Sequence, residues 1–126
     1  MFIEPSAGAG AFLPYLNNYK AFDILPANEN VLQADWLSLD KNNLSESEDI
    51  IVVIGNPPFG VQNNLAIKFF NSSAFADYIA FILPKSFKKT SIQNQLDLNF
   101  KLIAEKDIPS KSFLLNGESY GVNCVF

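Results

Sequence analysis

The sequence predicts an α/β fold with a doubly wound, mostly parallel sheet, and two observations carry this prediction. The run Ile50–Gly55 is apolar and rich in β-branched residues, which is typical of a central strand buried on both faces. Shorter apolar segments at 1–5, 19–24 and 30–34 precede it, each followed by polar or small residues. In such sheets ligands bind outside the carboxyl ends of the strands, so the residues after each strand are the candidate site.

The remaining elements follow from the same patterns. Strands are expected at 77–83, 100–106 and 121–126, and helices at 9–18, 62–74 and 90–98. The connections before the third and fourth strands show no helical pattern, so one flank of the sheet should be thinly covered and should meet a partner or a second copy. The prediction is a compact, mixed seven-stranded sheet with reduced helices and a C-terminal antiparallel hairpin.

Asn56-Pro57-Pro58-Phe59 directly follows the central strand. Two successive prolines fix φ twice and remove two backbone donors, so the segment should form a rigid turn. Such a turn holds the Asn56 amide and the carbonyls of Asn56 and Pro57 as convergent acceptors beside the Phe59 ring. This arrangement suits a planar group that bears an amino nitrogen. An ordinary strand-ending turn is the alternative, because Asn-Pro and Pro-Pro are common in turns.

The loop Glu4–Gly10 follows the first strand and contains only small residues after Pro5. Gly8 and Gly10 allow a ligand to approach the backbone, and the helix expected next would offer its N–H groups. The loop is neither a GxGxxG motif nor a P-loop. Glu4 would repel phosphate but accept from an ammonium, so the loop suits a nucleoside with an amino-acid tail. A turn without a ligand is the alternative.

Acidic residues also end the second and third strands. Asp23 stands where nucleotide-binding folds place an acceptor for ribose hydroxyls. Asp35 is suited to accept an adenine amino proton while Trp36 or Leu37 covers the ring. A solvated Asp23 and a core position for Trp36 are the alternatives.

In this order, the Glu4–Gly10 loop, Asp23, Asp35-Trp36 and Asn56–Phe59 resemble the motifs of S-adenosylmethionine-dependent amino-group methyltransferases of the Asn-Pro-Pro-Phe/Tyr kind. The segments Asn56–Phe70, Ile79–Lys88 and Phe113–Phe126 resemble a group of small bacterial and phage methyltransferases. The resemblance covers nearly the whole chain and implies a Rossmann-like class I methyltransferase fold. It implies N6 of adenine in DNA or RNA as the methyl acceptor. Because related enzymes with Tyr modify a glutamine amide in release factors, a protein acceptor is one alternative, and a non-catalytic cofactor-binding subunit is another.

The resemblance also assigns residues to the cofactor, S-adenosyl-L-methionine, and to the reaction. It implies that the cofactor-binding residues are Glu4, Pro5, Ser6, Ala7, Gly8, Gly10, Asp23, Ile24, Asp35, Trp36 and Asn56. It implies that the catalytic residues, which hold the acceptor, are Asn56, Pro57, Pro58 and Phe59. Transfer is expected to be direct, since positioning and electrostatics replace a strong base and the chain has no histidine.

A lysine cluster follows the fifth strand and falls on the same sheet edge. Lys85, Phe87 and Lys88, together with Phe59, are the candidate substrate-binding residues, through phosphate contact and base stacking. A solvated loop is the alternative. The net charge of −4 opposes the broad positive field of a stand-alone DNA or RNA binder.

Composition fits one catalytic domain over residues 1–126, without the N-terminal helix or the target-recognition domain that such enzymes often have. We expect a recognition or activator subunit, or a homo-oligomer, to complete it. No apolar run reaches ~18 residues, so no membrane span is expected. The single Cys124 cannot form an internal disulfide, which fits a cytoplasmic protein. No metal site is expected.

Overall fold

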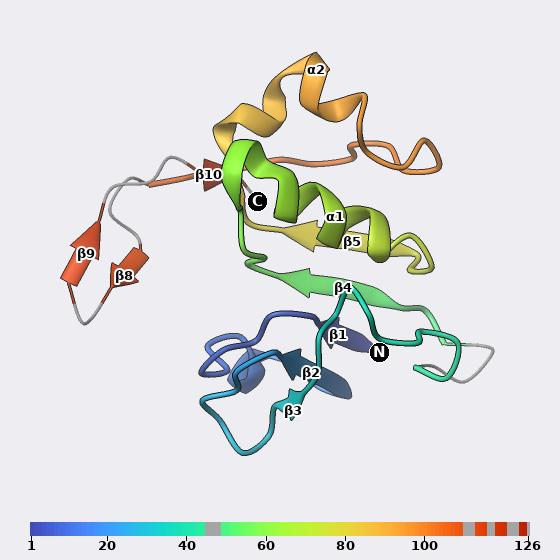
Figure 1. The fold of residues 1–126 in the computed structure, drawn as a ribbon, viewed down its shortest axis with the longest axis vertical. Coiled ribbons are helices and arrows are strands. Elements are labelled where there is room, and N and C mark those ends of the chain that lie inside the picture. The colour runs from blue at the N-terminus through green and yellow to red at the C-terminus, as the bar shows by residue number, and fades with distance from the viewer. Residues whose placement is uncertain (45–48, 110–112, 116–117, 121–123, 126) are drawn as a thin grey trace.

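The computed structural model describes residues 1–44, 49–109, 113–115, 118–120 and 124–125. Its central feature is a parallel sheet of five strands in the order β3-β2-β1-β4-β5 (Figure 1). The strands are β1 (Phe2–Glu4), β2 (Tyr19–Asp23), β3 (Leu32–Gln33), β4 (Val52–Gly55) and β5 (Tyr78–Phe81). The first four expected strands are therefore confirmed, with β3 reduced to two residues.

The order of the strands reverses at β1. The chain places β2 and β3 on one side of β1, then returns to place β4 and β5 on the other. β1 pairs in parallel with both β2 and β4. The carboxyl ends of β1 and β4 therefore flank the switch point, where ligands bind in open α/β sheets.

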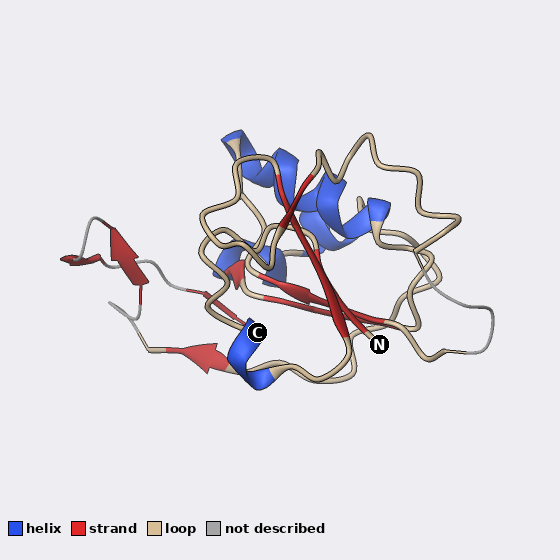
Figure 2. Ribbon diagram, turned by 90° about the horizontal axis from the view of Figure 1, so that it is seen from below, coloured by secondary structure: helices blue, strands red, loops and turns tan. Residues whose placement is uncertain are grey.

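The core lies between the sheet and the helix α1 (Asn64–Ser72), which covers one face of the strands (Figure 2). Phe69 of α1 belongs to a buried cluster that contains Ile3 of β1, Val53 of β4 and Trp36. Ile3 and Val53 have no exposed surface, as expected for the central strands of a parallel sheet. Within the described residues, no helix has the length and hydropathy needed to cross a membrane.

The helix expected at 62–74 is confirmed as α1, which follows the 3-10 turn η2 (Val61–Asn63). The helix expected at 9–18 is wrong, because only the 3-10 turn η1 (Leu13–Tyr15) forms there. Pro14 lacks an N–H group, and its ring is incompatible with a preceding helical turn. Between β2 and β3, and in the described part of the connection to β4, no helix occurs, as predicted.

The helix expected at 90–98 is shorter than predicted. After the 3-10 turn η3 (Lys85–Lys88), the helix α2 covers only Thr90–Gln93. The backbone after α2 forms hydrogen bonds with the side chain of Asn71 in α1 instead. Asn71 Nδ2 donates to the carbonyl oxygen of Gln95 at 2.9 Å, and Asn71 Oδ1 accepts from the N–H of Asp97 at 2.8 Å. These bonds draw the chain towards α1 and end α2.

The C-terminal part forms two further sheets in place of the single seven-stranded sheet that was predicted. The strand expected at 77–83 is divided at Ile82, and β6 (Leu83–Pro84) pairs with β10 (Cys124–Val125), which pairs antiparallel with β7 (Asp107–Ile108). β8 (Phe113–Leu115) and β9 (Glu118–Tyr120) pair only with each other. The break falls at Ile82, and Pro84 lies in β6, an edge strand of the second sheet, where a residue without an N–H group is tolerated.

The strand expected at 100–106 is wrong. Residues 101–106 are irregular and exposed, and β7 begins only at Asp107. Leu102 and Ile103 are 68% and 80% exposed, so this apolar stretch has no neighbouring surface that would hold it as a strand. For the strand expected at 121–126, Cys124–Val125 form β10, and the other four residues lie outside the described part of the chain.

Candidate cofactor and acceptor site

The loop after β1 and the turn after β4 meet at the switch point. Ser6 Oγ donates a hydrogen bond of 3.2 Å to the backbone oxygen of Asn56. A Cβ atom built on Gly55 would lie 3.6 Å from Glu4 Cγ and from Pro5 Cδ, which is ordinary contact distance. The two segments that the sequence assigned to the cofactor and to the acceptor are therefore neighbours.

The carboxylate of Asp23, at the end of β2, holds the small-residue loop. Asp23 Oδ2 accepts from the N–H of Gly8 at 2.8 Å, and Oδ1 accepts from the N–H of Leu25 at 2.8 Å. A carboxylate offers about four acceptor positions, so Asp23 retains capacity for a ligand. Ile24, which is 67% exposed, leaves an apolar surface beside it.

The loop conformation itself requires glycine at one position. Gly10 has φ +80°, and a Cβ atom there would lie 2.7 Å from Asn28 Nδ2 and 2.9 Å from Leu13 Cδ1. Asn28 Nδ2 also donates to the carbonyl oxygen of Ala9 at 3.0 Å. Pro5 and Ala7 are buried, and the N–H of Ala7 donates to the carbonyl oxygen of Phe22 at 2.8 Å, so these two residues support the loop from inside the protein.

Glu4, the last residue of β1, is the most unusual group of the site. Its side chain is buried, and within the described residues Oε2 has no hydrogen-bond partner. Burial, and then the negative charge of Asp23, raise the pKa of Glu4 to about 7. Because a buried carboxyl group without a partner is uncommon, this oxygen is the clearest place for a ligand to donate.

Asp35 and Trp36 differ in their positions. Asp35 is exposed, and its carboxylate accepts from the N–H of Leu37 at 3.1 Å and from Ser38 Oγ at 2.9 Å. Trp36 is 1% exposed and packs against Phe22, with ring centroids 6.1 Å apart. The expectation that Trp36 covers adenine is therefore wrong, because the indole has no free face and serves as a core anchor.

The Asn56–Phe59 turn combines exposed and fixed parts. Asn56 is exposed, and its backbone oxygen accepts from Ser6. Within the described part of the chain its side-chain amide has no hydrogen-bond partner, so the amide is free to bind a methyl acceptor. Pro57 is fully buried and Pro58 is exposed. Phe59 packs against the buried cluster of Ala66, Ile67 and Phe87, with part of its surface accessible. The turn is thus anchored on both sides of the exposed amide.

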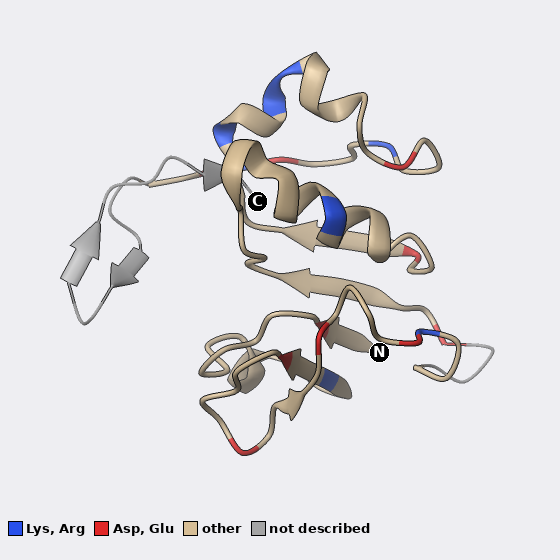
Figure 3. Ribbon diagram, in the orientation of Figure 1, with Lys and Arg blue, Asp and Glu red and all other residues tan. Residues whose placement is uncertain are grey.

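The predicted lysine cluster is partly neutralised. Lys88 Nζ lies 2.8 Å from Asp107 Oδ1, and Lys85 Nζ lies 3.6 Å from Asp107 Oδ2. The hydrogen bond with Lys88 holds the pKa of Asp107 below its usual value. Phe87 is 5% exposed and belongs to the Phe59 cluster, so the expected base stacking by Phe87 is wrong. Figure 3 shows the lysines of η3 on the side of the sheet that carries α2, away from β3.

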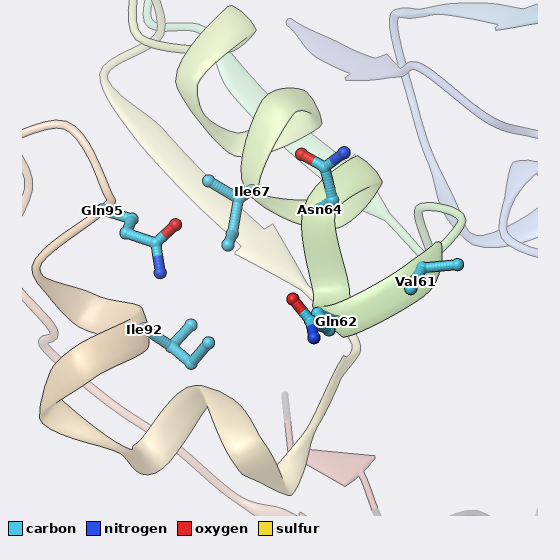
Figure 4. A pocket seen from close by; sticks show the side chains of 6 residues that line it. All are labelled: Val61, Gln62, Asn64, Ile67, Ile92 and Gln95. Atoms are coloured by element: carbon cyan, nitrogen blue, oxygen red, sulfur yellow. The ribbon is translucent and has the colours of Figure 1, made fainter.

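Two hollows occur on the described surface. One is lined by Leu37, Lys68, Asn71 and Ser72. The other lies beside the acceptor turn and is lined by Val61, Gln62, Asn64, Ile67, Ile92 and Gln95 (Figure 4). The second hollow has no signal in the sequence, since its residues come from two segments that only the fold brings together. No group of three or more metal-binding side chains occurs among the residues described.

Comparison with known proteins identifies the family. The profile described as the EDM2 methyltransferase-like domain matches residues 15–122. A curated relative, Protein ENHANCED DOWNY MILDEW 2 of Arabidopsis thaliana, is 42% identical over 53 residues, which cover 40% of this chain and 4% of the relative. The chain therefore matches a small part of that relative's length. No solved structure matches the chain. Because the family profile covers most of its length, the chain belongs to the EDM2 methyltransferase-like domain family.

Proposed function

We propose that this domain binds S-adenosyl-L-methionine and transfers its methyl group to a planar exocyclic amino nitrogen. The observation that carries the proposal is the contact between Ser6 and Asn56, which joins a loop suited to the cofactor to a turn suited to the acceptor. N6 of adenine in DNA or RNA is the first acceptor that we assign, on the resemblance of the Asn56–Phe59 motif. The methyltransferase-like family agrees with the general reaction.

The residues at this edge fit the proposed cofactor. The unpaired Glu4 Oε2 offers an acceptor for the ammonium of the methionine part. Asp23 has acceptor capacity for ribose hydroxyls, and the exposed Asp35 for an adenine amino group. Gly8, with φ +53°, brings the backbone close to Asp23. Glu4 ends β1 at the switch point, Asp23 ends the neighbouring β2, and Asp35 follows β3 at the edge of the sheet.

Once bound, the cofactor would supply an electrophilic methyl group on its sulfonium. The side-chain oxygen of Asn56 and the carbonyl oxygen of Pro57 would accept the amine protons of the acceptor and direct its nitrogen towards the cofactor side. The accessible part of Phe59 would pack on the acceptor's planar group. No strong base is needed, because the nitrogen would attack with its lone pair as the bond between the methyl carbon and sulfur breaks, and the surrounding acceptor oxygens would stabilise the developing positive charge. The methylated nitrogen would then release its proton to water, and the demethylated cofactor would leave as the product.

A glutamine side-chain amide in a protein is the second candidate acceptor. It is favoured by the burial of Phe87 and by the pairing of Lys85 and Lys88 with Asp107, which leave less surface for bases and phosphates than the sequence suggested. The acceptor amide is planar and carries two N–H protons, as an adenine amino group does.

Calorimetric titration of the purified chain with S-adenosylmethionine and its demethylated product tests the cofactor half. Transfer of a radiolabelled methyl group to single-stranded DNA, RNA or protein then tests the acceptor half. Binding followed by transfer supports the proposal. Binding without transfer to any of the three would identify a non-catalytic cofactor-binding subunit, and a folded chain that binds neither compound would refute the proposed function.

A further inference from the structure

A shallow groove lies beside the acceptor turn, between the start of α1 and α2 (Figure 4). It has a volume of about 510 Å³ and is lined by the side-chain amides of Gln62, Asn64 and Gln95 and by Val61, Ile67 and Ile92. In the described part of the chain, the side-chain amides of Gln62 and Asn64 have no hydrogen-bond partner. Val61 at the rim is 84% exposed. The groove therefore presents free donors and acceptors next to aliphatic surface.

The groove is continuous with the acceptor turn. Val61 and Gln62 follow the Asn56–Gly60 segment directly along the chain. Ile67 belongs to the cluster on which Phe59 packs, and Ile92 packs against the same cluster. A ligand that contacts Ile67 and Ile92 from the groove would therefore lie on the cluster against which Phe59 packs.

The backbone that forms one wall is held in an unfavourable conformation. Gln62 has φ 52° and Asn63 has φ 62°, although neither is glycine. Asn63 Nδ2 donates a hydrogen bond of 2.6 Å to Ser86 Oγ, which ties this turn to η3. Left-handed residues of this kind persist only where their surroundings impose them, and they concentrate at functional sites. The conformation turns the wall of the groove so that Gln62 lines it.

The chemistry of the lining favours one class of ligand. No charged side chain lines the groove to bind phosphate, and no aromatic ring lines it to stack on a base. Side-chain amides both donate and accept, as the backbone of an extended peptide does, and Val61, Ile67 and Ile92 suit an aliphatic side chain. We propose that the groove binds an extended, uncharged polypeptide segment and so docks a protein next to the acceptor turn.

The inference deepens the proposed function, because it favours the second candidate acceptor, a protein, over the adenine that the Asn56–Phe59 motif suggests. It rests on that function for the transfer step but not for the binding itself. Selection of a displayed library of random short peptides against the full chain tests the binding. We expect enrichment of uncharged peptides that contain aliphatic residues. The affinity of an enriched, fluorescently labelled peptide is then measured by anisotropy for the wild type and for variants of the groove.

Val61→Lys places a cation on the aliphatic rim and should weaken peptide binding by about tenfold. Gln62→Gly removes one amide at a position whose φ suits glycine, and should weaken binding by about threefold. Leu102→Lys is the matched control, because Leu102 is similarly exposed and lies outside the groove. This control variant should bind the peptide as the wild type does.

Failure to enrich peptides, or equal peptide affinity in the wild type and in Val61→Lys, would overturn the inference. A random pool of single-stranded DNA provides the opposing test: DNA binding that Gln62→Gly weakens would make the groove a nucleic-acid site instead, because this variant changes the groove without changing the charge. Titration with S-adenosylmethionine is carried out separately. Peptide binding that Val61→Lys weakens, in a chain that does not bind the cofactor, would refute the proposed function and leave the docking groove standing.

Discussion

The hydroxyl of Ser6 donates to the backbone oxygen of Asn56, and the two residues lie 50 positions apart in the sequence. The bond joins the loop after β1 to the turn after β4 and occupies one lone pair of the Asn56 carbonyl. The second lone pair and the exposed side-chain amide remain for a ligand. The backbone oxygen of Asn56 therefore holds the two loops together, whereas its side chain is available to a ligand, and a substitution changes only the second.

Asn56→Ala should abolish transfer while preserving cofactor affinity. The variant keeps the backbone oxygen that accepts from Ser6, so the two loops should stay together. It removes the side-chain oxygen that would accept from the amine, and loss of one positioned polar group of this kind typically lowers kcat by about 10²-fold or more. Single-turnover methyl transfer and calorimetry with S-adenosylmethionine measure the two effects. Loss of cofactor binding would mean that Asn56 acts in the cofactor half.

Asp23→Asn should weaken the cofactor. The amide retains one acceptor for Gly8 or Leu25, so the loop keeps part of its support, but the negative charge and most of the free acceptor capacity are lost. We expect the dissociation constant for S-adenosylmethionine to rise by about tenfold. Asp97→Asn is the matched control for this titration, because it makes the same change at a carboxylate outside the candidate site. A cofactor affinity equal to that of the wild type would remove Asp23 from the site.

The stability of the protein should depend on the ionisation of Glu4. Its pKa is raised from 4.5 to about 7 in the folded state, so the folded protein holds this proton more tightly than the unfolded chain. The contribution to stability is therefore complete below pH 4.5 and is lost as the pH rises through about 7. The loss should amount to about 3 kcal/mol.

Urea unfolding of the wild type and of Glu4→Gln at several pH values measures this contribution. The free energy of unfolding of the wild type should fall relative to that of Glu4→Gln between about pH 4.5 and pH 8, because the glutamine does not ionise. Parallel profiles for the two proteins would show that the buried carboxyl titrates at its ordinary pKa.

The sequence predicted those parts of the fold that are determined locally. β4 is a run of apolar residues with no competing pattern, and α1 has a broad apolar stripe, so both were found. The helix expected at 9–18 is wrong because the apolar pattern received more weight in the prediction than Pro14, which interrupts a helix. α2 was predicted too long because its end depends on Asn71, which lies in another helix.

For the candidate site, sequence reasoning found the segments but not the surroundings of each side chain. An aromatic residue next to a polar motif can stack on a ligand or pack in the core, and Trp36 and Phe87 both do the latter. The partner of Lys85 and Lys88 is Asp107, which follows them by 22 and 19 positions and meets them only through the pairing of β6, β10 and β7. No local pattern signals such a pair.

Removal of that partner should expose the lysine cluster. Asp107→Asn leaves Lys85 and Lys88 without their shared carboxylate, so the local positive charge increases. We expect single-stranded DNA to bind the variant more tightly than the wild type by a few fold at low salt, with a steeper dependence on salt concentration. Fluorescence anisotropy over a range of salt concentrations measures both quantities. The control is Asp97→Asn, whose carboxylate has no ion pair among the described residues.

Changing Lys85, Lys88 and Lys89 together to Ala in the Asp107→Asn background should restore weak binding. DNA affinity that is unchanged by Asp107→Asn would show that the cluster is a solvated surface and contributes nothing to acceptor binding. An increase that survives the loss of all three lysines would place the DNA elsewhere on the protein.

The left-handed turn at Asn63 should be held mainly by its bond to Ser86. Asn63→Gly loses this bond, worth about 1 kcal/mol, but also relieves the left-handed conformation, so its stability should be close to that of the wild type. Asn63→Ala loses the bond and keeps the strained conformation, so its free energy of unfolding should be lower than that of the wild type by about 1–2 kcal/mol. Ser86→Ala isolates the hydrogen bond. Urea unfolding should therefore rank Gly above Ala at position 63, whereas equal stability of the two would mean that the turn relaxes out of the left-handed region once the amide is removed.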